Sequence, residues 1–323
     1  MAEPAISEEQ FIHLFQTIGG AALARSTGVN ERSIHFRRRK IEQRRGITLS
    51  PPGMPPEQYS ILVRRHKARI DASVPDGIVL IFSDAHFWPS LVSTAHRAVL
   101  HFCKELKPEI VVCNGDAFDG SRISRHPKIG FLEKSPSVVD EIHAVQERLK
   151  EVEAAAPKAT LAWCLGNHDL RFEARLAAAA PEFEGVTGMH LKDHFSDRWQ
   201  PCWGLHINPG APSYTVVKHR WHNGIHATHN NIIKNHTSMV TGHLHSLKVT
   251  PWSDYTGTRY GVDCGTTAEP YDEQFTAYTE DAPVNWRSGF AVLQFHKGRL
   301  MWPELVHKWD EDHVEFRCQI IKV

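Results

Sequence analysis

The chain has 323 residues, with 37 lysines and arginines balanced by 37 aspartates and glutamates, 22 histidines and 6 cysteines. Its apolar content of 41% excludes a globally disordered chain, and its longest apolar runs are too short to span a membrane. The first ten residues lack the basic and apolar regions of a secretory signal peptide, so we expect a cytoplasmic protein with no membrane partner.

The neutral total conceals an uneven distribution of charge. Residues 1–72 hold 12 basic and 7 acidic residues, a net charge of +5, and the remainder therefore carries −5. The basic residues concentrate between positions 32 and 45, and four prolines in 50–56 then forbid a continuing helix. We expect three parts, which are a helical module over 1–48, a proline-rich linker with a short basic helix (57–71) over 49–75, and a main domain over 76–323.

The N-terminal module has the pattern of three short helices, over 8–18, 21–26 and 30–45, with Asn30 as the cap of the third. Ala24, Gly28 and Ile34 follow the spacing of a helix-turn-helix, in which a glycine makes the turn between two packed helices. Arginine at this density suits DNA phosphates, and the start of the third helix would lie nearest the base edges. The candidate DNA-binding residues are Asn30, Arg32, Ser33, Arg37, Arg38, Arg39, Lys40, Arg44 and Arg45. A solvated basic helix or a protein-docking element is the alternative.

The main domain has the pattern of an α/β fold. Short apolar runs, which predict buried strands, span 78–82, 110–113 and 160–165. The helices predicted to alternate with them span 93–106, 137–155 and 170–180. Further strands are predicted over 203–207, 214–218, 238–241, 260–263, 290–295 and 300–306. The alternation in the first half predicts a largely parallel sheet.

Polar side chains follow five of these predicted strands. They are Asp84 and His86, Asp116, Asn167 and His168, then His219 or His222, and finally His243 and His245. Ligands of α/β sheets bind at the carboxyl ends of the strands, so we expect these side chains to converge. Carboxylates, imidazoles and one amide suit Mn²⁺, Fe²⁺ or Zn²⁺, and no thiolate competes in these turns.

The ordered series Asp84-Ala-His86, Gly115-Asp116, Gly166-Asn-His-Asp169, His219 and Gly242-His-Leu-His245 resembles the calcineurin-like metallophosphoesterase superfamily. The resemblance covers about residues 76–323 and implies a two-sheet β-sandwich flanked by helices (αββα). It also implies two divalent metal ions, for which we expect Mn²⁺, with Fe or Zn as alternatives.

The resemblance also implies a division of the ligands. Asp84, His86 and His245 would hold one metal ion. Asn167, His219 and His243 would hold the other, and Asp116 would bridge the two. His219 is preferred because it directly follows the predicted strand, and His222 remains the alternative because it lies near the Asn-Gly turn.

Two further residues have implied catalytic roles. Asp119 would orient His168, which could protonate the leaving alkoxide or stabilise the phosphoryl transition state. A simpler alternative is that Asp119 only caps the turn that follows it. The nucleophile implied by the family is a metal-bridging hydroxide that attacks phosphorus in line.

We therefore expect a metal-dependent phosphodiesterase, either a DNA nuclease or a DNA-associated phosphodiesterase. One alternative is a phosphomonoesterase that acts on phosphoprotein or nucleotides. The motifs of the protein-phosphatase branch of the family differ from this chain at Phe118, Gly120, Ser121, Leu165 and Asp169, which argues against that alternative. Another alternative is a non-catalytic DNA-binding regulator, against which the complete set of candidate ligands argues.

Overall fold

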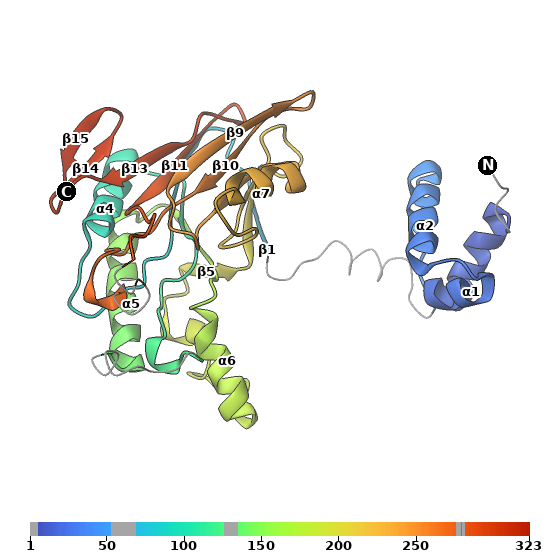
Figure 1. Ribbon diagram of the computed structural model, residues 1–323, viewed down its shortest axis with the longest axis horizontal. Coiled ribbons are helices and arrows are strands. Elements are labelled where there is room, and N and C mark those ends of the chain that lie inside the picture. The colour runs from blue at the N-terminus through green and yellow to red at the C-terminus, as the bar shows by residue number, and fades with distance from the viewer. Residues whose placement is uncertain (1–5, 53–68, 126–134, 276–278, 280–281) are drawn as a thin grey trace. The chain divides into compact units, whose positions relative to one another are not determined.

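The chain divides into two compact units, Met1–Lys67 and Ala68–Val323, referred to below as the N-terminal unit and the larger unit (Figure 1). A computed structural model describes residues 6–52, 69–125, 135–275, 279 and 282–323. In these residues, no helix combines the length and the apolar character that crossing a membrane requires.

The N-terminal unit contains two helices, α1 (Glu8–Thr27) and α2 (Glu31–Arg45). Gly19 lies within α1 but has a left-handed φ of 78°, so the helix breaks where the sequence predicts a break. The side chain of Asn30 accepts a hydrogen bond from the amide of Arg32 and caps α2, as predicted. The core of this unit consists of Phe11, Phe15, Leu23, Ile34, Ile41 and Leu49.

The short basic helix expected over 57–71 falls mostly outside the described residues. Its last three residues, which are described, form part of strand β1 (Arg69–Ala72), so a helix there is the wrong prediction. β1 pairs in parallel with β6 (Gly204–Ile207), and its side chains alternate between exposed and partly buried. The sequence does not predict this strand, because two of its four residues are charged and no apolar run marks it.

The larger unit contains two sheets. The first has the order β1-β6-β7-β8-β10-β9. Its other strands are β7 (Thr215–Val217), β8 (Ser238–Thr241), β9 (Lys248–Asp254) and β10 (Gly257–Asp263). Three of its five pairings are parallel, and those of β6 with β7 and of β9 with β10 are antiparallel.

The second sheet has the order β15-β14-β13-β11-β2-β3-β4-β5, with β12 paired to β11. Its parallel part comprises β2 (Gly77–Phe82), β3 (Ile110–Cys113), β4 (Thr160–Cys164) and β5 (Trp199–Cys202). Its antiparallel part comprises β11 (Gly289–His296), β12 (Arg299–Leu300), β13 (Glu304–Lys308), β14 (His313–Phe316) and β15 (Gln319–Lys322).

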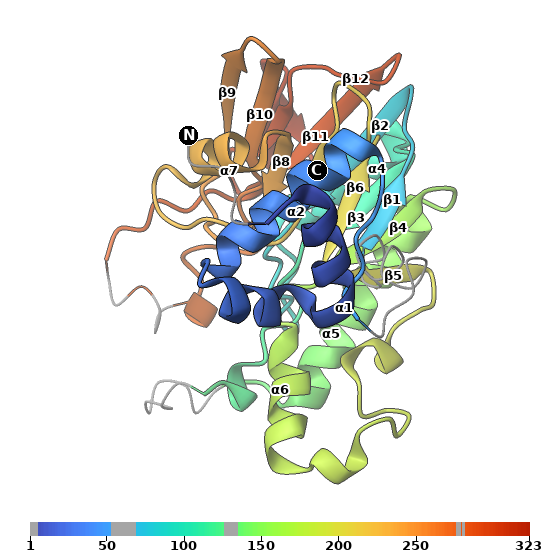
Figure 2. The same ribbon diagram turned by 90° about the vertical axis from the view of Figure 1, so that its right-hand side faces the viewer.

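The described part of the larger unit contains four α-helices, three of which cover the outer faces of the two sheets. They are α4 (Thr94–Leu106), α5 (Val138–Ala155), α6 (Leu170–Ala179) and α7 (Ala227–Asn235). Figures 1 and 2 show α4 and α5 together on one flank and α7 beside β9 and β10 on the other. Short 3-10 helices span Ser121–Ile123, Pro181–Phe183, Leu191–His194 and Glu273–Phe275.

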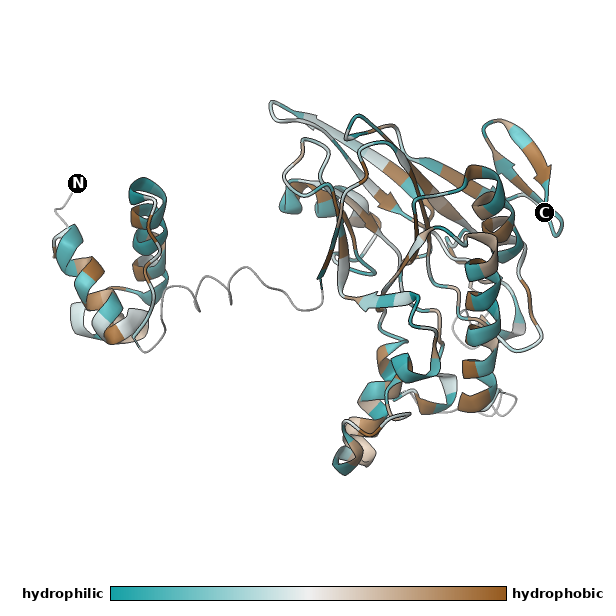
Figure 3. Cartoon of the chain, turned by 180° about the vertical axis from the view of Figure 1, so that it is seen from behind, coloured by the Kyte–Doolittle hydropathy of each residue, from teal (hydrophilic) through white to brown (hydrophobic). Residues whose placement is uncertain are grey.

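The alternation of side chains along the strands explains how two sheets stack with helices on both outer faces, which gives four layers. In β2, Val79 and Ile81 face the core between the sheets, while Leu80 and Phe82 face the core under α4 and α5. On the other side of the molecule, Ile232 of α7 packs in a smaller cluster with residues of β7 and β8. β2 is consequently apolar on both faces, and Figure 3 shows hydrophobic stretches, in brown, along strands of the larger unit. This arrangement confirms the predicted αββα sandwich.

We expect Phe102→Ala to lower the free energy of unfolding by about 3–5 kcal/mol, because it leaves a cavity in the core beneath α4. Phe102 is fully buried, and its ring lies 4.9 Å from that of Phe316 and 5.9 Å from that of Phe290, between centroids. Chemical denaturation followed by circular dichroism measures the loss. Phe183→Ala, at a residue 44% exposed, is the control and should cost less than about 1 kcal/mol.

Candidate metal centre

The candidate ligands come from the loops that follow neighbouring strands of both sheets. Asp84, Asp116 and Asn167 follow the parallel strands β2, β3 and β4, whose carboxyl ends meet at one edge. His219 and His243 follow β7 and β8, which are parallel neighbours in the other sheet. The backbone amides of Asp84 and Gly242 donate to the carbonyls of the adjacent loops. The two sheets therefore present their loops to one shared place, as the strand-end rule predicts.

The backbone at these loops is strained. Asp84, His86, Asp116, His243 and His245 have φ values of 52°, 40°, 53°, 70° and 56°. A residue other than glycine in the left-handed region costs roughly 1–2 kcal/mol. The strain lies at the loops that carry the candidate ligands, where it turns the chain sharply enough to bring their side chains together.

Three groups of side chains are close enough to share a metal ion, since their ligand atoms lie within 4.8 Å of one another. The groups are Asp84, His86 and His245; His86, Asp116 and His168; and Asp116, His219 and His243. Asp116 and His86 each belong to two groups, and Asp116 is the carboxylate shared by the last two. The predicted ligands that are aspartates or histidines all fall in these groups, except His222.

Asn167 and His219 lie next to each other. The Nε2 atom of His219 is 3.2 Å from the Asn167 amide oxygen and 3.2 Å from a carboxylate oxygen of Asp116. Its Nδ1 lies 2.8 Å from the carbonyl of Asn114 and donates to it, which leaves Nε2 for the cluster. His222 belongs to none of the three groups in the described part of the chain, and its amide donates to Asn231. The structure thus favours His219 over His222.

The charges of the cluster suit a divalent cation. Burial alone would raise the pKa of Asp84, but His245 and His219 outweigh it and lower that pKa to about 2. Burial would likewise raise the pKa of Asp116, but the neighbouring histidines, above all His219, outweigh it and lower that pKa. Burial lowers the pKa of His219, but the charges of Asp116 and Asp84 raise it to about 10. The cluster therefore holds ionised carboxylates that attract positive charge, beside imidazole nitrogens and an amide oxygen, which fits Mn²⁺, Fe²⁺ or Zn²⁺.

Asp119 contacts two histidines with a single carboxylate oxygen. This oxygen lies 2.9 Å from Nδ1 of His86 and 2.9 Å from Nδ1 of His168. Asp119 therefore does more than cap a turn, because it fixes both rings and leaves each Nε2 directed elsewhere. Burial alone would lower the pKa of His168, but Asp119 and Asp116 together raise it. A guanidinium nitrogen of Arg171, 3.2 Å from Nε2 of His168, opposes that rise.

Asp169 organises the loops around the cluster, a role that the sequence analysis did not assign. Its carboxylate accepts hydrogen bonds from the amides of Gly166, Asp116 and Phe118 and from the indole of Trp163, at 2.8 to 3.1 Å. It therefore connects the loop after β4 to the loop after β3. In the sequence, the one sign of this role is the position of Asp169 at the end of the Gly-Asn-His-Asp series.

The basic helix α2 has two kinds of cationic side chain. Arg37 and Arg38 lie over the core rings of Phe11 and Phe15, at 4.8 and 5.6 Å from their centroids. Arg44 and Arg45 pair with Glu8 of α1. The candidate residues exposed to solvent are Asn30, Arg32, Ser33, Arg39 and Lys40. Of these, Lys40 lies over the ring of Phe36. Phe36, on the same face, is also 60% exposed.

The sandwich with clustered carboxylates and imidazoles at its strand ends defines a metal-binding α/β protein of the phosphoesterase type. The profile of the family described as calcineurin-like phosphoesterase matches residues 78–263. The chain belongs to this family, as its motifs indicated, and the family binds two divalent metal ions.

Solved structures with a similar fold have low sequence identity. Wild-type Vps29 complexed with Zn²⁺ from Entamoeba histolytica is 13% identical, with a TM-score of 0.41, over 76% of this chain and 98% of that one. YfcE, a phosphoesterase from E. coli, is 16% identical, with a TM-score of 0.34, over 70% of this chain and 97% of that one. No curated protein matches the chain significantly.

Glu141 of α5 anchors the loop that carries Asp119. One carboxylate oxygen accepts from the amide of Gly120 at 2.6 Å, and the other accepts from the hydroxyl of Ser121 at 2.8 Å. Burial, together with the charge of Asp119, raises the pKa of Glu141 from 4.5 to about 7. The folded protein thus retains a proton on Glu141 at pH values where the unfolded chain has lost it.

We expect Glu141→Gln to become progressively more stable than the wild type as the pH rises from about 4.5 to about 7. In that interval, ionisation of Glu141 favours the unfolded chain, by up to about 3 kcal/mol above pH 7, whereas glutamine does not ionise. Urea denaturation of both proteins at pH 4.5, 6 and 8 measures the difference. An equal difference at all three pH values would contradict the raised pKa.

Proposed function

We propose that this chain is a metal-dependent phosphodiesterase that hydrolyses nucleic-acid strands, with DNA as the principal substrate and Mn²⁺ as the preferred metal. The observation that carries this proposal is the position of Asp116, whose carboxylate belongs to two adjacent groups of candidate ligands. A carboxylate in this position suits two metal ions, and two-metal centres commonly cleave phosphate esters.

Each candidate ligand has a defined place in the proposed centre. Asp84, His86 and His245 would hold one metal ion, and Asn167, His219 and His243 the other, with Asp116 between them. Two bound cations would supply an activated water nucleophile and neutralise charge on the phosphoryl oxygens. The protein itself fixes the imidazoles, since Asp119 holds His86 and the Asn114 carbonyl holds His219 through their Nδ1 atoms.

His168 is placed to move a proton to the leaving oxygen. Asp119 holds its Nδ1, and its Nε2 lies 3.9 Å from a carboxylate oxygen of Asp116, at the edge of the cluster. The raised pKa of His168 favours the protonated form that a general acid requires. Arg171 would contact the same substrate oxygen or a neighbouring one, because its guanidinium lies beside Nε2 of His168.

The N-terminal unit is proposed to bind DNA through the exposed face of α2. Arg32, Arg39 and Lys40 are exposed on this helix, and Lys40 lies over the exposed ring of Phe36, with Nζ 5.0 Å from its centroid. Exposed cations of this kind contact phosphates, whereas Arg44 and Arg45 are partly neutralised by Glu8. A DNA-binding unit attached to a nuclease would raise the local concentration of substrate.

With Mn²⁺, the full chain should hydrolyse bis(p-nitrophenyl) phosphate and cleave DNA, and Asp116→Asn should lower kcat/KM by about 100-fold or more. The reason is that the shared carboxylate would serve both metal ions, whose charge stabilisation is worth several kcal/mol. The assay follows nitrophenolate release, with DNA cleavage resolved on gels.

Asp310→Asn is the matched control, because this exposed carboxylate lies on the turn before β14. Turnover of p-nitrophenyl phosphate without cleavage of either diester substrate would favour a phosphomonoesterase instead. Equal activity of Asp116→Asn and the wild type would reject the metal centre as the place of reaction.

Arg32→Gln and Arg39→Gln should each weaken binding to duplex DNA and reduce the slope of log affinity against log salt by about 1, because each removes one phosphate contact. Fluorescence anisotropy between 50 and 200 mM salt measures both quantities. Lys322→Gln, the same change of charge in the larger unit, should alter neither. An unchanged salt slope in both arginine variants would show that α2 does not contact DNA.

A further inference from the structure

A cavity of about 480 Å³ opens beside the candidate metal centre on the side of Asn167 and His219. Trp203 and Trp221 line it, as do the cationic side chains Lys218 and Arg220. The cavity therefore combines candidate metal ligands, two aromatic rings and two positive charges within one site of the larger unit.

The two tryptophans are unusually exposed for residues of this size. Trp203 is 42% exposed and Trp221 is 48% exposed, although indole rings normally gain stability from burial. The ammonium of Lys218 lies 4.8 Å from the centroid of Trp221, so this ring already holds a cation over its face. Two exposed aromatic rings and two cations around one cavity form a surface suited to a planar ligand that carries negative charge.

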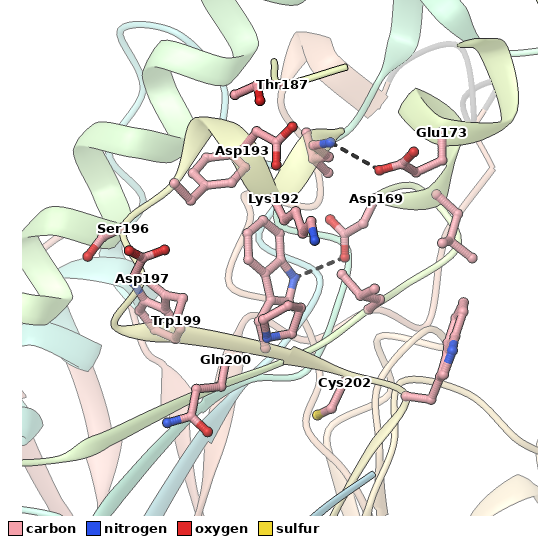
Figure 4. Close-up of a pocket in the computed structure, with 17 residues that line it drawn as sticks. Asp169, Glu173, Thr187, Lys192, Asp193, Ser196, Asp197, Trp199, Gln200 and Cys202 are labelled. Atoms are coloured by element: carbon pink, nitrogen blue, oxygen red, sulfur yellow. Dashed lines mark hydrogen bonds between the residues drawn. The ribbon is translucent and has the colours of Figure 1, made fainter. Parts of the chain in front are cut away.

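A second cavity, of about 690 Å³, adjoins the first and shares Leu165, Leu170 and Trp203 with it. Figure 4 shows that Trp199 and Lys192 line this second cavity and that the carboxylate of Asp169 accepts from an indole within it. Trp203 therefore stands where the two cavities meet. A chain-like ligand that passes Trp203 would have room on both sides of this ring.

We propose that the first cavity seats an unpaired nucleotide next to the scissile phosphate. Its base would stack on Trp203 or Trp221, and Lys218 and Arg220 would bind the flanking phosphate. This assignment rests on the proposed phosphodiesterase function and narrows its substrate to strands with unpaired nucleotides. The chemistry is shared by DNA and RNA, because both present a base face and a phosphodiester.

The need for an unpaired base follows from the geometry of nucleic acids. Inside a duplex, both faces of a base are covered by its neighbours, so an aromatic side chain stacks on a base only after the base leaves the helix. Tryptophan and arginine beside a cationic groove are the usual means of holding single strands without sequence preference. We therefore expect cleavage of single strands, ends or loops rather than of intact duplex.

The test uses the full chain with Mn²⁺ and compares a dinucleotide with an analogue that lacks one base. The measured quantity is the ratio of kcat/KM for thymidylyl-thymidine to kcat/KM for its abasic analogue, with uridylyl-uridine as the RNA arm. At least one of the variants Trp203→Ala and Trp221→Ala should lower this ratio by about fivefold or more, because the stacking contact with the base is lost. Trp203→Phe and Trp221→Phe should retain most of it, because they retain an aromatic face.

Trp309→Ala, which removes an indole that is 61% exposed and lies outside both cavities, is the control and should leave the ratio unchanged. A wild-type ratio close to 1, or ratios unaffected in both alanine variants, would overturn the nucleotide seat while the phosphodiesterase remains. If the wild type hydrolysed no diester, including bis(p-nitrophenyl) phosphate, the proposed function would fail instead. Calorimetry would then measure the affinity for the same dinucleotides. Weaker binding by the alanine variants would support the nucleotide seat, and unchanged binding would reject it.

Discussion

Buried negative charge is the constraint on which the site depends. Asp84, Asp116 and Asp119 are almost completely inaccessible to water, yet the pKa of each is lowered, so all three are ionised. Burying several carboxylates together is unfavourable unless positive charge lies beside them. In this fold the surrounding imidazoles supply hydrogen bonds, and divalent metal ions would supply the remaining charge. Metal binding and the protonation of these histidines are therefore coupled, because a cation and a proton compete for the same nitrogens.

The second requirement is geometric, since side chains far apart in the sequence must reach one point. Parallel strands in each sheet deliver loops to the same edge, and left-handed backbone at five of the candidate ligands turns their side chains inward. Asp169 then connects two of these loops, because it accepts from the amides of Asp116 and Phe118 in the loop after β3 and from the amide of Gly166 in its own loop. Glycine is required where loops touch, because a Cβ at Gly166 would overlap the carboxylate of Asp116. The stability of the sandwich thus sustains a strained site.

The sequence predicted those parts of the molecule that have strong local signals. Apolar runs located β2, β3 and β4, and the residues that follow them located Asp84, Asp116 and Asn167. Strands β5 and β9 were missed because Trp-Gln-Pro-Cys contains a proline and a polar residue, and β9 is largely exposed, so neither shows buried periodicity. The hydrogen bonds of Asp169 and the contact of Asp119 with His86 were not predicted, because they depend on how loops meet in space. Sequence spacing shows which residues follow strands but not which atoms they then contact.

The segment after β7 shows how one short stretch can serve both the metal centre and the proposed substrate. His219 is 2% exposed and faces Asp116, while its neighbours Lys218 and Arg220 line the adjacent cavity. Lys218 and Arg220 flank this candidate ligand in the chain, so both positive charges lie in the cavity wall next to the metal centre. Trp221 follows directly and adds its ring to the same wall. The order Lys-His-Arg-Trp therefore places a candidate metal ligand and the proposed contacts to phosphate and base in one short segment. A shift of this segment would displace the ligand and these contacts together.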